Sequence, residues 1–247
     1  MIQIPLSRKI LDFIQEFFGK PASLYTLIEN CPDISMQLNE PKHSISWSDS
    51  VIFWQNWHSV DYNKAKGELN GFNNDNGHYS CFSEVVNELL NFTTCKIIEN
   101  WQCDIQEIVG LSCSKSTLKD FATLDQMVET NSQEMITPVT IDKLHQNLEH
   151  REIRIIHNEN TDDHFVQYMW DGRLFLINAG GSHHFAAARY IANRLNISVS
   201  LSGKLYIYSI NEQSVISLCN KYEMFIINVK YLLHFHEIMR NFRVSYL

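Results

Sequence analysis

Residues 165–195 restrict the possible folds of this chain more than any other stretch. Phe165–Trp170 and Arg173–Ile177 are two runs rich in aromatic and aliphatic residues, and the Asp171-Gly172 pair between them is a strong signal for a β-hairpin. After a Gly-Gly pair, Ser182–Leu195 places apolar residues on one helical face, and its alanines favour the helix. The sequence therefore predicts two strands and a packed helix in close succession, within an α+β fold.

Helical spacing of apolar residues recurs elsewhere in the chain. Ser7 is in position to cap a helix in which Ile10, Phe13, Ile14 and Phe17 share one face, and this face is expected to pack against the rest of the protein. The other predicted helical segments are Ser80–Phe92, Ser116–Val128, Asp142–Leu148, Ser214–Asn220 and Tyr231–Arg240.

Short apolar runs between turn residues predict strands. They cover Cys95–Trp101, Ile136–Ile141, Arg151–His157, Ile197–Ser200, Leu205–Ile210 and Met224–Val229. The Asn- and Gly-rich residues 70–77 are expected to form an exposed loop. The polar residues 129–134 lack apolar periodicity and are the predicted boundary between a mainly helical N-terminal region, 1–130, and a C-terminal domain with a mixed sheet and packed helices, 131–247.

The overall composition is that of a globular protein with an ample core. The chain has 247 residues, 45% of them hydrophobic and 19% charged, enough for one large domain or two small ones. Its formal charge of -8 argues against a surface built for nucleic-acid phosphates. The six cysteines include no CxxC pair, so no structural zinc is expected. Neither haem nor flavin is expected.

The N-terminal segment combines basic and apolar residues as a signal peptide does. Arg8 and Lys9 precede an apolar stretch, but Asp12, Gln15 and Glu16 interrupt it, which indicates an amphipathic helix instead. No run reaches the ~18–20 apolar residues of a membrane span. The expected location is the cytoplasm, without a membrane partner, and export by a signal-independent machine is the alternative.

The candidate functional site is the turn Gly180-Gly181-Ser182-His183-His184, which joins a predicted strand to the helix Ser182–Leu195. The first turn of a helix has unpaired N–H groups and the positive end of the dipole, so it favours an anion such as phosphate. Paired glycines let a ligand approach the backbone closely. Two adjacent imidazoles at this position suit base catalysis, neutral hydrogen bonding or metal ligation.

The same turn has a purely structural interpretation. Gly180-Gly181 is then only a tight turn, and Ser182 only an N-cap. The doubled histidine favours the functional interpretation over this one.

Gly180-Gly181-Ser182-His183-His184-Phe185-Ala186-Ala187-Ala188 resembles the signature turn of the ParB/sulfiredoxin fold. Sulfiredoxins carry Gly-Gly-Cys-His-Arg there, and ParB-type proteins and related free-serine kinases carry Gly-x-Arg-Arg or Asp-Gly-His-His/Arg before an alanine-rich helix. Met135–Leu144 is similar to the opening strand and turn of ParB-like domains, and Asn196–Val199 to a later strand. The resemblance spans roughly residues 135–211 and implies a mixed sheet with packed helices.

The resemblance implies that this turn holds the phosphates of ATP, CTP or ADP, together with Mg²⁺, and that the chemistry is phosphoryl transfer or hydrolysis. Two differences from the family motif limit which activities the resemblance implies. Ser182 stands where sulfiredoxins have their reactive cysteine, which excludes sulfinic-acid repair, and His184 replaces the usual arginine. Only residues 212–247 remain for a DNA-binding domain and the chain is acidic, so a chromosome-partitioning role is not expected.

Several residues outside the turn are candidate ligands. Arg154, near a predicted neighbouring strand, and Arg189, in the helix, are candidates for phosphate binding, with ordinary ion pairs as the alternative. Asp162, Asp163 and His164 precede the hairpin as a weak candidate metal set, with a solvated turn as the alternative.

The preferred function is a nucleotide-dependent phosphotransferase or nucleotide hydrolase. Gly180, Gly181 and Ser182 bind phosphate in this hypothesis, and His183 or His184 acts in acid–base catalysis with Ser182. The alternatives are a ParB-like nuclease or toxin-type effector, and a non-catalytic binding or regulatory protein. Expected partners are a nucleotide or phosphorylated small molecule and a protein that binds the N-terminal region, with nucleic acid less favoured.

Overall fold

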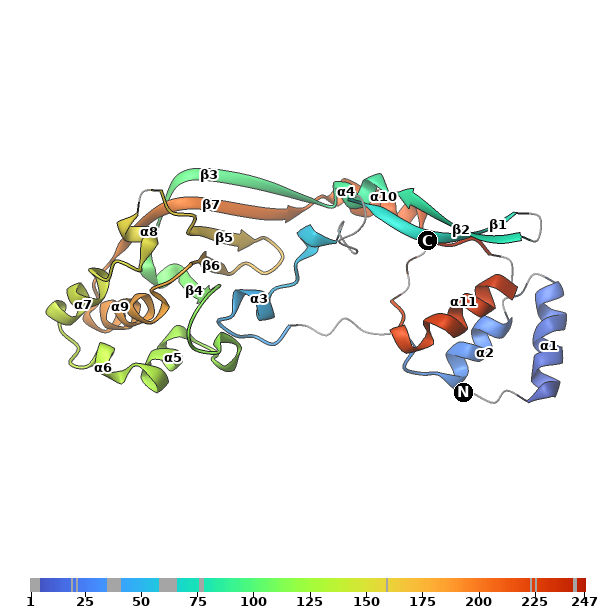
Figure 1. Ribbon diagram of the computed structural model, residues 1–247, viewed down its shortest axis with the longest axis horizontal. Helices are drawn as coiled ribbons and strands as arrows, with labels where there is room; N and C mark the ends of the chain where they lie inside the picture. Colours follow the sequence, from blue (N-terminus) through green and yellow to red (C-terminus); the bar gives the residue numbers. More distant parts are fainter. Residues whose placement is uncertain are drawn as a thin grey trace. The chain divides into compact units, whose positions relative to one another are not determined.

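The chain divides into two compact units, each built from separate segments of sequence. A computed structural model describes residues 5–18, 20, 22–34, 41–57, 66–75, 78–158, 160–222, 224, 226–241 and 244–247. The first unit combines Met1–Asn39, Trp57–Asn91 and Gln213–Leu247, and the second combines Glu40–Asn56 and Phe92–Glu212. Figure 1 labels the elements of both units. None of the described helices is both long enough and apolar enough to cross a bilayer.

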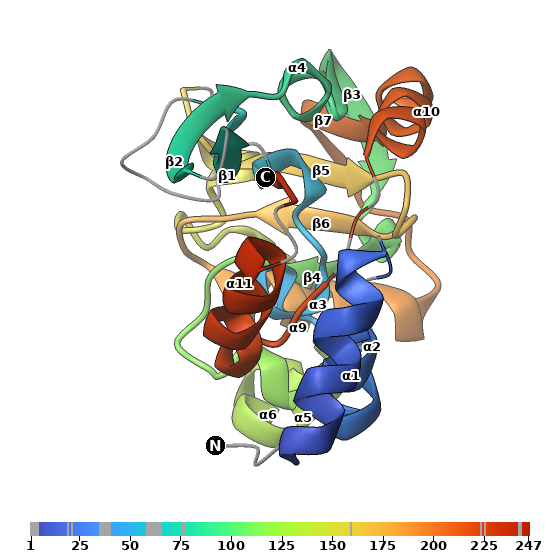
Figure 2. The same cartoon turned by 90° about the vertical axis from the view of Figure 1, so that its right-hand side faces the viewer.

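The first unit contains a helical group and a two-stranded sheet. Its elements are α1 (Leu6–Phe17), α2 (Ala22–Asn30), β1 (Glu68–Asp75), β2 (His78–Val85), α4 (Asn87–Leu90), α10 (Glu212–Lys221), the 3₁₀ turn η4 (Val229–Tyr231) and α11 (Leu232–Asn241). Helix α2 contacts both α1 and α11 (Figures 1 and 2). Leu27, Cys31, Ile34 and Phe235 form its small buried core, and β1 pairs with β2 in antiparallel register.

The second unit is organised around a five-stranded mixed sheet in the order β3-β7-β5-β6-β4. The strands are β3 (Thr93–Asp104), β4 (Ile108–Leu111), β5 (His164–Tyr168), β6 (Leu174–Ile177) and β7 (Ser200–Ile210). β7 pairs antiparallel with β3 and parallel with β5, while β6 pairs antiparallel with β5 and parallel with β4.

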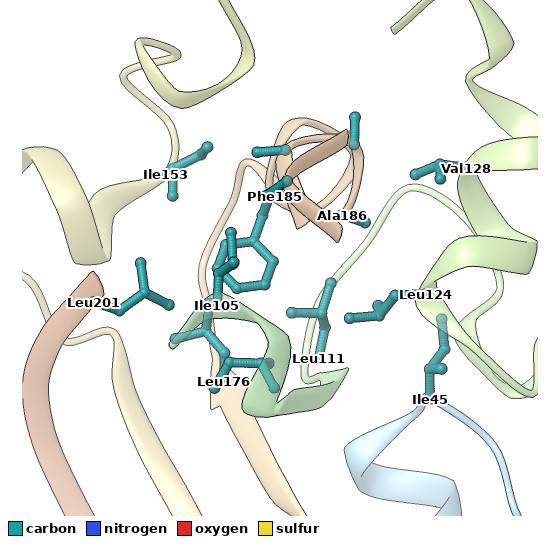
Figure 3. Packing of buried hydrophobic residues seen from close by; sticks show 14 of the residues in the cluster. Ile45, Ile105, Leu111, Leu124, Val128, Ile153, Leu176, Phe185, Ala186 and Leu201 are labelled. Carbon is teal, nitrogen blue, oxygen red and sulfur yellow. The ribbon is translucent and has the colours of Figure 1, made fainter. Parts of the chain in front are cut away.

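Alternating side chains of this sheet cover two separate cores, as the two-residue period of a strand requires. Phe165, Leu174 and Leu176 lie in the larger core together with Phe185 and Ile105. Figure 3 shows Leu176, Phe185 and Ile105 within this core. The intervening residues Val166, Tyr168 and Phe175 pack on the opposite face with Val51. Both faces are therefore covered, which explains why β5 and β6 read as continuous apolar runs.

Helices cover the face of the larger core. The central one is α9 (Ser182–Leu195), which contacts α5 (Leu124–Asn131), α6 (Gln133–Ile136) and α7 (Ile141–Leu148) (Figure 1). The remaining short elements are α3 (Trp47–Ser50), η1 (Trp54–Asn56), η2 (Ile105–Glu107), η3 (Leu118–Asp120) and α8 (Arg154–His157). Ala186, Ala187 and Ala188 are fully buried, so small side chains allow α9 to approach its neighbours closely.

The fold is α+β, as predicted, and the elements with the strongest patterns are confirmed. Ser182–Leu195 is helical over its whole predicted length, and the predicted hairpin is the β5–β6 pair. The predicted N-terminal helix and the predicted segments that begin at Cys95, Asp142, Leu205, Ser214 and Tyr231 all correspond to elements of the same type. Ser7, the predicted cap of the first helix, lies instead inside α1, whose N-cap is Pro5. For 116–128 the helix starts only at Leu124, after η3.

Other predictions are wrong. Residues 70–75 are part of β1 instead of a loop, and residues 80–85 belong to β2, so only a short helix follows at Asn87–Leu90. Residues 136–141 contain the end of α6, a cis Thr137-Pro138 peptide and the start of α7, in place of a strand. Residues 154–157 form helix α8, and 197–199 precede β7 without belonging to it.

The N-terminal region also differs from its prediction, because the described part of residues 1–130 contains the strands β1 to β4 as well as helices. Residues 129–134, the predicted domain boundary, lie inside the second unit, where α5 ends and α6 begins. Residue 225, within the predicted strand 224–229, lies outside the described residues, and 229 begins η4.

Candidate functional site

The Gly180-Gly181 turn is narrow because another backbone segment of the same unit lies directly against it. A Cβ atom at Gly181 would lie 2.6 Å from the carbonyl carbon of Glu152, and Gly181 has a φ of 68°. At Gly180 a Cβ atom would lie 2.9 Å from Oε2 of Glu152. Both glycines therefore permit a close approach, but the approaching group is Glu152 of this chain.

A buried asparagine ties the turn to the segment after β4. Oδ1 of Asn178 accepts hydrogen bonds from the backbone N–H groups of Ser112 and Cys113, each at 3.2 Å, and its Nδ2 donates to the carbonyl oxygens of Cys113 and Gly180. Ser182 is also buried, and its hydroxyl donates to Oγ of Ser114 at 3.0 Å. The Ser182 hydroxyl thus points to a neighbouring serine.

His183 lies between two serine hydroxyls. Its Nε2 is 3.0 Å from Oγ of Ser116, and its Nδ1 is 2.5 Å from Oγ of Ser132. The Asn131 amide donates to Oγ of Ser116 at 2.8 Å. The Asn131 amide fills one lone pair of Ser116 and leaves the hydroxyl proton free to point at Nε2, so the geometry accommodates the tautomer in which Nε2 accepts this proton and Nδ1–H faces Ser132.

His184 is held by α7. Its Nδ1 lies 3.0 Å from Oδ1 of Asn147, whose Nδ2 donates to the carbonyl oxygens of Met135 and Lys143. Oδ1 of Asn147 is therefore the acceptor, and Nδ1 of His184 is protonated. The His184 ring also stacks on His150, with centroids 3.7 Å apart and planes inclined by 13°.

Both imidazoles favour the neutral form. Burial is the main cause that lowers the pKa of His183 below its ordinary value, with Glu134 opposing the shift. Burial also lowers the pKa of His184, and the charges of His150 and His183 act in the same direction. A neutral imidazole at near-neutral pH is the form that accepts a proton from a hydroxyl.

The two predicted phosphate-binding arginines lie in different places. Arg154 pairs with Glu152 at 3.3 Å and is therefore close to the glycine turn. Arg189 donates to Oδ1 of Asp125 at 2.9 Å and to the carbonyl of Gln106, and its buried Nε has no hydrogen-bond partner among the described residues. Burial lowers the pKa of Arg189, against the effect of Asp125.

The candidate metal ligands Asp162, Asp163 and His164 do not form a shared site. In the described part of the chain, no group of three or more His, Cys, Asp or Glu side chains is placed to hold a metal ion. Oδ1 of Asp163 instead accepts the backbone N–H of Ala179 at 2.9 Å, and Nδ1 of His164 faces the carbonyl of Asp162 at 2.7 Å. Burial raises the pKa of Asp163 although the Ala179 bond opposes the shift.

Residues that sequence reasoning missed complete the surroundings of His183. Ser114, Lys115 and Ser116 lie in the segment after β4, and Ser132 lies between α5 and α6. Lys115 is exposed, while Ser114 and Ser116 are half-buried. Serines and a lysine in a loop form no periodic pattern that would mark them as a site. The one local signal is that the segment Ser112-Cys113-Ser114-Lys115-Ser116 is rich in hydroxyls and contains a cation.

A surface pocket lies at the opposite end of α9 from the histidines. It is lined by Asp104, Gln106, Ala192, Asn193, Asn196, Ile197 and Ser198. None of the predicted site residues lines it, so it is separate from the His183 cluster.

The arrangement defines an α+β protein with a serine–histidine cluster at the start of a helix that packs on a mixed sheet. Residues 98–247 match the family model described as "Family of unknown function (DUF6685)", and the chain belongs to this family. No curated protein matches the chain, and no solved structure does.

Proposed function

We propose that the protein is a nucleotide-binding phosphotransferase or nucleotide hydrolase whose reacting groups are Ser116 and His183. The observation that carries this proposal is the 3.0 Å distance between Oγ of Ser116 and Nε2 of His183. A hydroxyl beside a neutral imidazole is the pairing from which an activated oxygen nucleophile is made. Ser132 orients the imidazole through Nδ1, as the third group of such a cluster does.

The surroundings of this pair suit a ligand with negative charge. Lys115 is exposed next to Ser116, and His183 belongs to the first turn of α9. The positive end of a helix dipole and a lysine both stabilise phosphate oxygens. The phosphate is therefore proposed to lie beside Lys115 and His183. It does not lie over Gly180-Gly181, because Glu152 occupies that space.

The proposed reaction is transfer of a terminal phosphoryl group. Oγ of Ser116 forms a bond to the terminal phosphorus while its proton passes to Nε2 of His183, and the bond from phosphorus to the leaving phosphate oxygen breaks. Water or an acceptor hydroxyl then takes the phosphoryl group from Ser116. Mg²⁺ would accompany the nucleotide and neutralise part of its charge. The resemblance to the ParB/sulfiredoxin fold supports the nucleotide as ligand.

A thermal-shift experiment tests binding. ATP, ADP and CTP, each with and without Mg²⁺, are added to the full chain, and one of them should raise the melting temperature, since a ligand at 100 times its Kd stabilises a protein by about 2.7 kcal/mol. Lys115→Ala should reduce the shift, whereas Lys119→Ala, an exposed lysine nearby, should leave it unchanged. No shift with any nucleotide contradicts the proposal.

A turnover assay separates binding from chemistry. Ser116→Ala and His183→Gln should each abolish release or transfer of phosphate while the nucleotide-induced shift remains. Equal turnover in both variants and the unmodified chain would contradict the assigned roles.

The non-catalytic alternative has one observation in its favour: both imidazoles are hydrogen-bonded to side chains of the scaffold. In that case His183→Gln lowers stability and changes no measurable activity. The nuclease or toxin-type alternative is tested by growth arrest on expression, which His183→Gln would relieve.

A further inference from the structure

Helix α1 turns its polar side toward the protein. Its only buried residue is Asp12. Nε of Arg8 lies 3.0 Å from both Oδ1 of Asp12 and Oγ1 of Thr26 on α2. One turn further, Oε1 of Glu16 accepts the backbone N–H of Ser23 at 3.0 Å. Polar contacts therefore hold α1 against α2 (Figure 2).

The outer side of α1 is apolar. Phe13 and Phe17 are 70% and 80% exposed, and Leu6, Ile10, Ile14 and Phe18 are exposed as well. This is the face that the sequence predicts to be packed. Removing apolar side chains from water is favourable, so a continuous exposed row of them favours a covering surface.

The spacing of this row indicates what covers it. Leu6, Ile10, Phe13 and Phe17 follow one another at intervals of four, three and four residues, which is the repeat of a helix that packs against another helix. The intervals read the same in both directions. A second α1 in antiparallel orientation therefore places Leu6 opposite Phe17 and Ile10 opposite Phe13, and the row matches itself.

The charges beside the row are complementary under the same symmetry. Lys9 and Glu16 flank the row at equivalent heptad positions, seven residues apart. In an antiparallel pair of helices, flanking positions of the same kind meet across the interface, so Lys9 of each copy faces Glu16 of the other. Lys9 is exposed and Glu16 is half-buried. Oε1 of Glu16 accepts the Ser23 N–H, so Oε2 is the carboxylate oxygen that faces Lys9 of the other copy.

We infer that α1 is a dimerisation helix that packs antiparallel on α1 of a second copy of this chain. The two copies are related by a two-fold axis, the usual symmetry of a homodimer. This inference does not depend on the proposed function, because it concerns the first unit and involves none of the residues around His183.

Sedimentation velocity of the full chain over a wide concentration range tests the inference. The unmodified chain should form a dimer, and Phe13→Glu should weaken it at least about tenfold, which corresponds to about 1.4 kcal/mol. Leu233→Glu is the matched control, because Leu233 on α11 is 80% exposed and lies outside the row. Circular dichroism of each variant establishes that it is folded.

A charge exchange provides a second measurement. Lys9→Glu should weaken the dimer. The double variant Lys9→Glu, Glu16→Lys should dimerise more tightly than Glu16→Lys alone, as a double-mutant cycle measures. A chain that stays monomeric at every concentration overturns the inference. So does a dimer that tolerates Phe13→Glu, or a monomer that binds lipid vesicles through this face.

Discussion

Helices α9 and α1 are both amphipathic, but they use their two faces in opposite ways. In α9 the buried residues are mostly apolar, including Phe185, Ala187 and Ile191, and the polar start of the helix contacts serines and asparagines. In α1 the buried residue is Asp12, and the apolar side is exposed. An apolar row therefore predicts a helix, but only its neighbours decide which side faces the protein.

The largest expected effect separates the two helices directly. Phe185→Ala removes a side chain that is 1% exposed and should lower the free energy of unfolding by about 3–5 kcal/mol. Phe13→Ala in the monomer should change it by no more than about 0.5 kcal/mol. Urea titrations at low protein concentration measure both. Comparable losses in the two variants would show that α1 packs through its apolar side after all.

An intermediate effect is expected for the polar contacts of α1. Asp12→Ala leaves the Arg8 guanidinium, which also donates to Oγ1 of Thr26 on α2, without its carboxylate partner on α1, and a hydrogen-bonding group that loses its partner in this way costs about 1–3 kcal/mol. The loss should be local, so hydrogen exchange should become faster in α1 and stay unchanged in α9. Asp12→Asn, which keeps an acceptor oxygen, is the control. Unchanged exchange in α1 contradicts the contact with α2.

The smallest expected effect concerns pH. Burial lowers the pKa of His183 and His184 below 6.5, so the unfolded chain binds protons before the folded chain does as the pH falls. Their contribution to stability is complete above about pH 6.5 and decreases as the pH drops from there through the folded-state pKa values.

Thermal unfolding between neutral and acidic pH measures this dependence. Replacing His183 and His184 together by glutamine should flatten it, while His145→Gln, at an exposed position of α7, should not. An unchanged slope in the double variant would mean that the two rings are as easily protonated in the folded chain as in the unfolded one.

The sequence predicts the fold best where a single pattern is strong. The helix Ser182–Leu195 and the β5–β6 hairpin combine periodicity with turn residues, and both are confirmed. The sequence predicts a loop over part of β1, although β2, the next strand along the chain, is its partner, because β1 is rich in Asn and has no alternation of apolar and polar residues. Apolar residues of β2 also fit a helix by spacing alone.

The candidate site was predictable only in part. Gly180 to His184 are recognisable because their types and order are unusual together. Ser116 and Ser132 come from segments separated from His183 by many residues, and nothing local marks them as its neighbours. The role of the two glycines, which admit the backbone of Glu152, depends equally on a contact that only the folded chain contains.

The division of the chain among the two units has a consequence for biosynthesis. The segments of the second unit, Glu40–Asn56 and Phe92–Glu212, are both present once residue 212 has been translated. The first unit joins Met1–Asn39 to Gln213–Leu247, so α2 can contact its partner α11 only after the later segment has been translated. Since domains fold as units during synthesis, the unit that contains His183 has all its segments before the first unit has its own.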